Sequence, residues 1–413
     1  MKKALKGIAF FLMLFLAANV AFAGEIDLLV KKLAEKGIID YGEAQTILTE
    51  TKEEVRKEIA QGKSESLPQW VQKINLKGDF RLRYQSEKKD GSTSRDRFRY
   101  RFRLKSTAKV TEGFEAGFGL ATGGTDPRST NQTMQNSFET PDIRLDYAYG
   151  KWTPLSGLDI YGGKFANMFK KPGSTSDLLW DGDINIEGLA IAYSQGKTGF
   201  FFHLGYLILD EWSSSTSDPY LIAVQPGYKF NLGEIASAQV GVAYYAFSNV
   251  KGAALDHSEG GNSLVEQGSG ENITEVLKHE YKCWSPSVKV NFDSPFGGIV
   301  ERFSIFADYV KNNDPSDKNT GYLGGLSFGA KKIKNAGDWQ VKYMYRKLEA
   351  DAWLDIFPDS DAYSGATGIK GSEVILNVGL AKDVSFGIDY YDIQQISSGK
   401  HKKIWQFDIS LKF

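Results

Sequence analysis

The chain has 413 residues, of which 41% are hydrophobic and 13% aromatic, and 43 of them are glycine. Lysine and arginine together number 50 and aspartate and glutamate 51, and this balance argues against a nucleic-acid partner. The one cysteine, Cys283, excludes an internal disulfide, and since no metal-ligand spacing surrounds it we expect neither a metal nor a cofactor.

The first 23 residues have the pattern of a secretory signal peptide. Three lysines come first, at Lys2, Lys3 and Lys6, and an apolar stretch at 8–20 ends in Ala21-Phe22-Ala23. A run of about 13 apolar residues is too short to cross roughly 30 Å of hydrocarbon as a helix. We therefore predict a signal peptide at 1–23 and an exported mature chain.

Residues 24–67 are predicted to form a short helical segment in the periplasm. Its first part has apolar residues at helical spacing, namely Ile26, Leu29, Val30 and Leu33. Asp40 can cap a second helix, with Glu43 three residues further on as in a capping box. The apolar stripe is narrow, so two interpretations remain. The segment forms a short coiled coil with copies of itself or another periplasmic component, or it is a solvated tether without a partner.

From residue 71 onward the hydrophobic period changes to two residues. In the first strand Leu76, Gly78, Phe80, Leu82 and Tyr84 alternate with Asn75, Lys77, Asp79, Arg81 and Arg83. In the second strand Phe98, Tyr100, Phe102 and Leu104 alternate with Arg97, Arg99, Arg101, Arg103 and Lys105. One face suits lipid and the other water. Because no long apolar segment follows the signal peptide, an exported membrane protein of this kind has to be a closed barrel.

The cations of the second strand decide which face turns inward. A cation that faces lipid at the middle of the bilayer costs roughly 2 to 4 kcal/mol. A slip of one residue would place every cation of the strand in lipid, so the register is strongly fixed. We therefore predict that the arginines face the interior of the barrel.

Further strands are predicted at 114–122, 142–152, 158–165, 183–193, 199–209, 220–230, 236–248, 281–292, 302–311, 319–331, 338–349, 370–381, 384–393 and 402–413. The total is about sixteen, an even number as in bacterial barrels. Short and long connections alternate, which places short turns in the periplasm and long loops outside. The predicted fold is all-β, a transmembrane antiparallel β-barrel of about sixteen strands at 68–413.

One local stretch carries a family resemblance. It runs Leu178-Leu179-Trp180-Asp181-Gly182-Asp183-Ile184-Asn185-Ile186-Glu187-Gly188, after Gly163-Lys164-Phe165 and Phe169-Lys170-Lys171-Pro172. With the signal peptide, the helical segment and the porin-size barrel, the chain resembles the putative porin family of Gram-negative bacteria over nearly all of 24–413. The resemblance implies a passive channel in the outer membrane for small hydrophilic solutes and ions. Barrel size and the helical segment also lead us to expect a homo-oligomer, most simply a trimer.

The arginines of the first two strands are the strongest candidates for pore-lining residues, as an anion-attracting wall. A hairpin centred near residue 90 would place Arg83 beside Arg97, Arg81 beside Arg99 and Asp79 beside Arg101. Opposed like charges destabilise a sheet, so a purely structural role would favour alternating signs. Gly117 and Gly119 are expected to leave room for the arginine side chains. The alternative is that acidic residues on other strands or on an inward loop neutralise the wall.

Acidic residues at predicted inner positions are the counterpart: Asp142, Asp146, Asp183, Glu187, Asp389 and Asp408. In sixteen-stranded general porins the loop between the fifth and sixth strands folds inward. Carried over by resemblance, this makes Lys170, Lys171, Asp177 and Asp181 candidate constriction residues. The longer loop at 249–280 could fill the pore instead, and the sequence does not decide between them.

Two other functions stand as alternatives. An outer-membrane hydrolase needs a histidine beside a serine or a carboxylate. His203 is the one histidine well inside a predicted strand, but Phe201 and Gly205 flank it on its face. An adhesin or structural barrel has a lumen filled by side chains, which is typical of about eight strands, whereas about sixteen leave an aqueous channel. We therefore expect a channel and no enzyme.

Overall fold

The computed structural model describes residues 40, 42–43, 46, 73–169, 178–213, 215–269, 273–296 and 299–413. The chain divides into two compact units, Met1–Gln72 and Lys73–Phe413. In the first unit the Glu43 N–H donates a hydrogen bond to Asp40 Oδ1 at 2.8 Å, which confirms the predicted helix cap. The predicted signal peptide and most of the helical segment lie outside the described residues. Among those that are described, no helix is long and apolar enough to cross a membrane.

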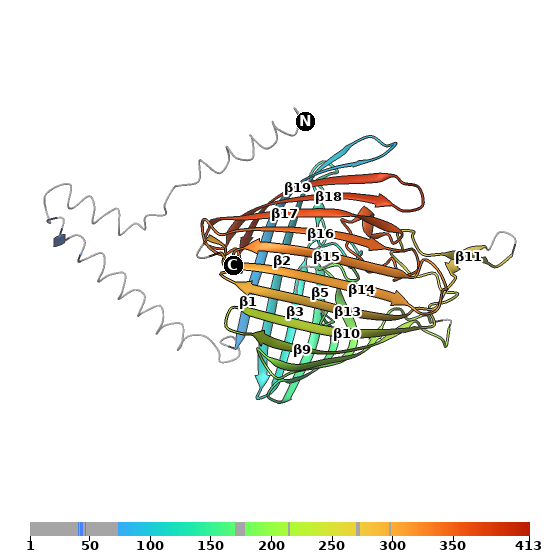
Figure 1. Cartoon of the computed structure of the whole chain (residues 1–413), viewed down its shortest axis with the longest axis horizontal. Helices are drawn as coiled ribbons and strands as arrows, with labels where there is room; N and C mark the ends of the chain where they lie inside the picture. Colours follow the sequence, from blue (N-terminus) through green and yellow to red (C-terminus); the bar gives the residue numbers. More distant parts are fainter. Residues whose placement is uncertain are drawn as a thin grey trace. The chain divides into compact units, whose positions relative to one another are not determined.

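The second unit is a closed antiparallel barrel (Figure 1). Its sixteen main strands are β1 (Ile74–Lys89), β2 (Arg95–Thr111), β3 (Phe114–Ala121), β5 (Arg144–Leu155), β6 (Leu158–Ala166), β7 (Asn185–Ser194), β8 (Gly199–Ile208), β9 (Tyr220–Leu232), β10 (Ala236–Ser248), β13 (Lys282–Asp293), β14 (Arg302–Asn312), β15 (Thr320–Gly329), β16 (Trp339–Leu348), β17 (Ile369–Ala381), β18 (Val384–Gln395) and β19 (His401–Lys412). Each pairs with its neighbours along the chain, and β19 returns to pair with β1. The closed ring therefore leaves no main strand with an unpaired edge.

The strand count and the all-β class confirm the prediction from the sequence. Most boundaries agree closely, but β1 and β2 extend further than predicted, to Lys89 and Thr111. Large apolar side chains point outward along the strands, as with Leu145, which is 61% exposed, and Leu189, which is 63% exposed. A continuous apolar outer face of this kind suits a lipid environment.

Connections of two different lengths alternate around the barrel. Short turns such as 112–113, 156–157 and 382–383 join strands at one end. Long connections at 122–143, 167–184, 249–281 and 349–368 join them at the other. These long connections also hold the short elements β4 (Gln132–Thr133), β11 (Leu264–Gln267), β12 (Thr274–Leu277) and the 3₁₀ turn η2 (Tyr363–Gly365).

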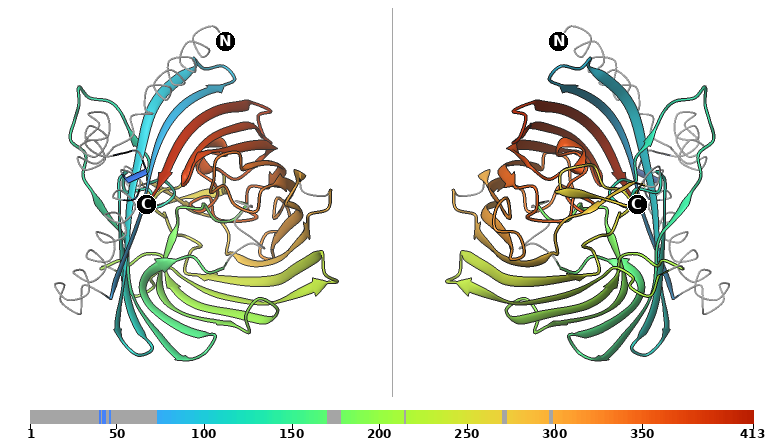
Figure 2. Two further views of the ribbon diagram at one scale, coloured as in Figure 1. Left: turned by 90° about the vertical axis from the view of Figure 1, so that its left-hand side faces the viewer. Right: turned by 90° about the vertical axis from the view of Figure 1, so that its right-hand side faces the viewer.

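Parts of the long connections lie inside the ring of strands, as the two views of Figure 2 show. Segments 178–184, 249–281 and 349–368 supply buried residues to one hydrophobic core that also includes inward-facing residues of β10, β13 and β14. The interior of the barrel is therefore partly filled by its own connections, and the candidate site lies where they meet the wall.

The assignment of inner and outer faces can be tested on two adjacent residues of β13. Val288 is 37% exposed on the outer face, and Ser287 points inward, where its hydroxyl lies 3.4 Å from Gly241 O. Val288→Arg is expected to lower the free energy of unfolding from lipid vesicles by about 2 to 4 kcal/mol, the cost of a cation in hydrocarbon. Ser287→Arg, the matched control, should change it much less. Equal losses would contradict the assignment.

Candidate functional site

The arginine ladder consists of Arg81, Arg83, Arg97, Arg99, Arg101 and Arg103. It lies on the inner face of β1 and β2 because odd-numbered residues alternate with the apolar residues of the outer face, such as Phe98, which is 45% exposed. Hydrogen bonds from the ladder to connections inside the ring agree with this placement.

The register of the β1–β2 hairpin differs from the predicted one by two residues. Arg83 lies opposite Arg99, Arg81 opposite Arg101, and Asp79 opposite Arg103. The reason is the turn, which is centred on Gly91 with φ 78°, one residue beyond the predicted centre. Two pairs of arginines still face one another across the hairpin, so carboxylates from elsewhere have to balance them.

Two carboxylates of the barrel wall bind the ladder. Asp408 on β19 makes a two-pronged contact with Arg83, at 2.7 Å to Nε and 2.8 Å to Nη2. Asp79 on β1 accepts hydrogen bonds from Arg101 at 2.8 Å and from Arg103 at 2.9 Å. Such bidentate and charge-assisted contacts are among the stronger hydrogen bonds in proteins.

Two further carboxylates come from the inward connections. Asp183 lies 2.9 Å from Arg103 Nη1 and also accepts a hydrogen bond from the Thr130 hydroxyl at 3.0 Å. Asp361 lies 3.2 Å from Arg83 Nη1. Segments 178–184 and 349–368 are thus fastened to the wall by ion pairs. At Arg83 and Arg103, therefore, carboxylates of inward connections neutralise the positive charge. This is one of the two alternatives that the sequence left open.

The remaining ladder arginines have weaker or neutral partners. Arg97 lies 3.2 Å from Glu87 Oε2. Arg99 donates to Gln85 Oε1 at 3.3 Å and to the Ser129 hydroxyl at 3.4 Å. Six arginines therefore face five carboxylates: Asp79, Glu87, Asp183, Asp361 and Asp408. Counted over these contacts, the arginines of the ladder outnumber the carboxylates by one.

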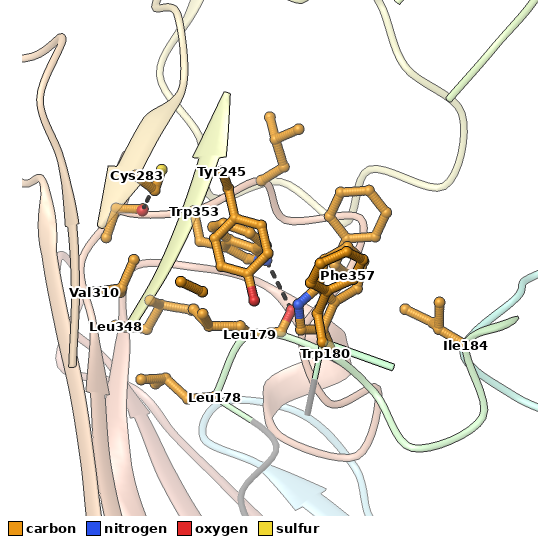
Figure 3. Close-up of a cluster of buried hydrophobic side chains, with 14 of the residues drawn as sticks. Leu178, Leu179, Trp180, Ile184, Tyr245, Cys283, Val310, Leu348, Trp353 and Phe357 are labelled. Carbon is orange, nitrogen blue, oxygen red and sulfur yellow. Dashed lines mark hydrogen bonds between the residues drawn. The ribbon is translucent and has the colours of Figure 1, made fainter. Parts of the chain in front are cut away.

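An aromatic core lies across the ring from the ladder, against β10 and β13–β16 (Figure 3). Trp353 is fully buried at its centre, with ring centroids 4.9 Å from Tyr245 and 5.2 Å from Phe247. The Trp180 ring packs against Phe357 at a tilt of 44°, with the ring centroids 4.6 Å apart. The Trp353 indole N–H donates to Leu179 O at 2.7 Å, so the polar atom of this buried ring is satisfied.

Arg128 fastens three of the connections together. Its side chain is completely buried, and it forms an ion pair with Asp126 of its own connection at 3.1 Å. It donates to Asp355 O at 2.9 Å and to His257 O at 3.0 Å. These two acceptors belong to 349–368 and 249–281, so a single buried cation links segments that are far apart in the sequence.

Segment 349–368 is also held by its backbone. The Asn262 amide donates to Ala350 O at 2.6 Å and to Trp353 O at 2.8 Å, and it accepts from the Asp355 N–H at 3.0 Å. Arg346 of β16 also lies 2.8 Å from Asp359 of this segment and pairs with Glu373 of β17. Buried charges of this kind stabilise only when paired.

The sequence prediction missed the central role of 349–368. It considered 166–181 and 249–280 as inward loops and treated 350–368 only as long. The signal was the run Ala352-Trp353-Leu354 followed by Ile356 and Phe357, which is too apolar for a solvated loop. Asp361 was missed because it lies in this segment, which was not expected to fold inward.

The other predicted residues occupy several different environments. Lys170, Lys171 and Asp177 lie outside the described residues. Asp142 lies before β5 with its side chain 82% exposed, 3.7 Å from Arg144. Asp146 sits at an irregularity in the β3–β5 pairing and accepts a hydrogen bond from the Asn185 amide at 2.9 Å. Asp389 lies on β18 among buried charges that include Glu373.

Glu187 does not face the interior as predicted. It shares the outer face of β7 with the exposed Leu189, whereas Ile186 and Ala190 are buried on the inner face. Glu187 instead forms an ion pair with Lys164 of β6 at 2.8 Å. The small residues Gly188, Ala190 and Ala192 made the two faces of this strand hard to tell apart in the sequence.

Asp181 joins the two inward segments. Its carboxylate accepts hydrogen bonds from the Ser360 N–H at 2.8 Å and from the Asp183 N–H at 2.9 Å. Burial, together with the charges of Asp183 and Asp359, raises the pKa of Asp181 well above its usual range. Burial acts in the same direction on Asp361, but the charges of Arg83, Arg99 and Arg81, together with a hydrogen bond from Gln406, outweigh it and lower the pKa of Asp361.

His203 and Cys283 contact residues of the barrel wall and of the core. His203 Nδ1 lies 3.1 Å from Gln225 Oε1, and Cys283 is fully buried, with its thiol 3.6 Å from Ala352 O. Within the described part of the chain, no group of three or more His, Cys, Asp or Glu side chains is placed to hold a metal ion.

A closed barrel of sixteen strands with an apolar outer face, a charged inner wall and inward connections has the architecture of an outer-membrane porin. The family model described as "Putative porin" matches residues 43–94, 88–272 and 290–413. The chain belongs to this family, which confirms the resemblance seen in the sequence. A search of curated proteins finds no match.

Solved porin structures resemble the barrel at low sequence identity. OprB of Pseudomonas putida, in its high-pH structure, is 11% identical with a TM-score of 0.54, over 83% of this chain and 95% of that chain. A triple mutant of the Rhodopseudomonas blastica porin is 12% identical with a TM-score of 0.46, over 82% and 100% of the two chains. The match to OprB supports the barrel fold.

The ion pair between Asp361 and Arg83 predicts an acid-sensitive connection. Because the pKa of Asp361 is lowered in the folded chain, its stabilising contribution is present above about pH 3.9 and is lost as the pH falls through the lowered pKa. Asp361→Asn should lower the amide protection factors of 349–368 by about ten- to a hundredfold at pH 7, since a hydrogen bond to a charged group contributes about 1.5 to 3 kcal/mol. Wild type should approach the variant below about pH 4.

Hydrogen exchange, corrected for the intrinsic rate at each pH, measures this effect. Asp317→Asn, in the exposed connection 313–319, is the control and should leave the protection unchanged. Unchanged protection in Asp361→Asn would contradict the role of the ion pair.

Proposed function

We propose that this porin is a passive channel for small hydrophilic solutes and ions, with a slight preference for anions. The observation that carries the proposal is the charged seam between the arginine ladder and the inward carboxylates Asp183 and Asp361. Charged and polar groups line this side of the interior, and the aromatic core occupies the other side. A barrel of about sixteen strands is wide enough to leave an aqueous passage along such a seam.

The anion preference follows from the excess of arginine over carboxylate in the ladder. An arginine paired with a carboxylate contributes little net electric field. The preference for anions therefore rests above all on Arg99, whose hydrogen-bond partners Gln85 and Ser129 are neutral. Opposed charges across a narrow passage also orient polar solutes as they cross it.

The proposed assembly is a trimer in the outer membrane with the helical segment in the periplasm. Three observations support it: the size of the barrel, the capped helix start at Asp40, and exposed apolar residues in the connection 122–143. In that connection Phe138 is fully exposed and Met134 is 49% exposed. Apolar side chains that stand free of the barrel suit contact with a further copy.

Planar-bilayer recording tests this function. The purified protein should give large, stable conductance steps that close in three equal parts, and a salt gradient should give a zero-current potential with the sign of weak anion selectivity. Arg99→Gln together with Arg101→Gln should reduce the anion permeability, because the ladder then has more carboxylates than arginines. Arg95→Gln, 61% exposed at the hairpin tip, is the control.

Three outcomes would contradict parts of the proposal. Absence of any conductance step would assign a structural barrel without an open channel. Cation selectivity in the wild type would contradict the anion preference. Closure in a single step for every insertion would contradict the trimer.

A further inference from the structure

A row of four aromatic rings lines the inner wall beside the arginine ladder. The aromatic row consists of Tyr147 and Tyr149 on β5 and Tyr161 and Phe165 on β6. Neighbouring ring centroids lie 6.0, 5.8 and 5.3 Å apart in that order. Trp152, which has the opposite parity in β5, is 44% exposed on the outer face, so the row faces the interior.

Two glycines of β3 let the tyrosine rings lie against the wall. A methyl group added at Gly117 would stand 2.5 Å from Tyr149 Cζ, and one added at Gly119 would stand 2.3 Å from Tyr147 Cε1. The prediction that these glycines leave room for the arginines is therefore wrong, because the tyrosine rings occupy that space. A ring that covers a glycine turns one face to the wall and the other to the interior.

The middle of the row is open compared with similar rings elsewhere in the barrel. Phe201 over Gly227 and Phe306 over Gly325 have the same packing but are only 3% and 2% exposed. Tyr149 and Tyr161 are half-buried. The inner face of the next strand, β7, carries small residues, Gly188, Ala190 and Ala192. No bulky side chain from these three positions covers the rings.

Polar groups surround the edges of these two rings. The Tyr149 hydroxyl donates to Glu115 Oε1 at 3.1 Å, and Lys151 Nζ lies 3.3 Å from the same atom. The Tyr161 hydroxyl lies 3.5 Å from Asp159 Oδ2. The row thus combines flat apolar surfaces with two carboxylate acceptors and one ammonium donor, all on the inner wall of a channel.

This combination matches the chemistry of a pyranose sugar. Such a ring has a face of C–H groups, which packs on an aromatic ring, and a rim of hydroxyls, which both donate and accept hydrogen bonds. Binding sites for small molecules commonly pair apolar surface with a few placed polar groups. We propose that Tyr149 and Tyr161, with Glu115, Lys151 and Asp159, bind neutral pyranose sugars as they pass through the barrel.

The inference rests on the proposed channel function, since a solute has to enter the lumen to reach the row. A neutral solute is favoured over an anion at this place because two carboxylates flank one lysine. A flat aromatic solute would stack as well, but it would offer no hydroxyls to Glu115 and Asp159. The carboxylates therefore select for the sugar.

Block of the ion current by maltotriose in planar bilayers tests the site. Added maltotriose should reduce the wild-type current in a saturable manner. Tyr149→Leu and Tyr161→Leu should each raise the half-blocking concentration about two- to tenfold, the loss expected for one stacked ring. Tyr149→Phe keeps the ring, so maltotriose should block the current through this variant at nearly the wild-type concentration. Tyr345→Leu removes a tyrosine that is 37% exposed on the outer face and should have no effect.

The possible failures are distinguishable. If the wild type conducts but maltotriose leaves the current unchanged, the sugar site is wrong and the channel stands. Equal block in wild type and both leucine variants also overturns the site. Block by benzamide, a neutral flat aromatic solute, without block by maltotriose would assign the row to flat aromatic solutes and overturn the sugar proposal. If the wild type gives no conductance, the channel function fails and the sugar site fails with it.

Discussion

Arginines inside a barrel have to be balanced, and this requirement organises the interior of the protein. Wall carboxylates Asp79 and Asp408 balance part of the ladder, and connections that fold inward supply Asp183 and Asp361. An unpaired buried charge costs several kcal/mol, so the ladder favours conformations in which these segments reach the wall. The ion pairs thus determine where the inward connections contact the wall of the barrel.

Once inside, the connections stabilise one another through apolar contacts. Trp353 and Phe357 from one connection meet Trp180 from another and Tyr245 from the wall. Arg128 and Asn262 satisfy carbonyl groups that would otherwise be buried without partners. The interior therefore combines an aromatic core, centred against β10 and β13–β16, with a charged seam along β1 and β2.

The strands of this barrel and their inner and outer faces were largely predictable from the sequence. The connections that fold into the interior were not. Alternation over two residues and the cost of a cation in lipid placed the strands and turned the ladder inward, because both effects are local. The hairpin register was wrong by two residues because it depends on the position of Gly91 in the turn. Glu187 was placed on the wrong face because β7 carries small residues on its inner side.

The inward connections depend on contacts between segments far apart in the chain. Arg128 binds backbone oxygens more than a hundred residues away, at His257 and Asp355. Nothing local in the sequence near Arg128 indicates those partners. The apolar run around Trp353 is a signal that its connection is buried, which the prediction missed, and it does not indicate the residues against which the connection packs. The tyrosines over Gly117 and Gly119 were missed because they come from a neighbouring strand.

The connection 349–368 fills part of the lumen, and we expect it to narrow the passage. The most direct test replaces residues 352–366 by a short glycine-serine linker and compares single-channel conductance with that of the wild type. A severalfold larger conductance is expected, since the centre of the aromatic core and the Asp361 ion pair are removed. An unchanged conductance would show that the constriction lies elsewhere and that 349–368 does not narrow the lumen.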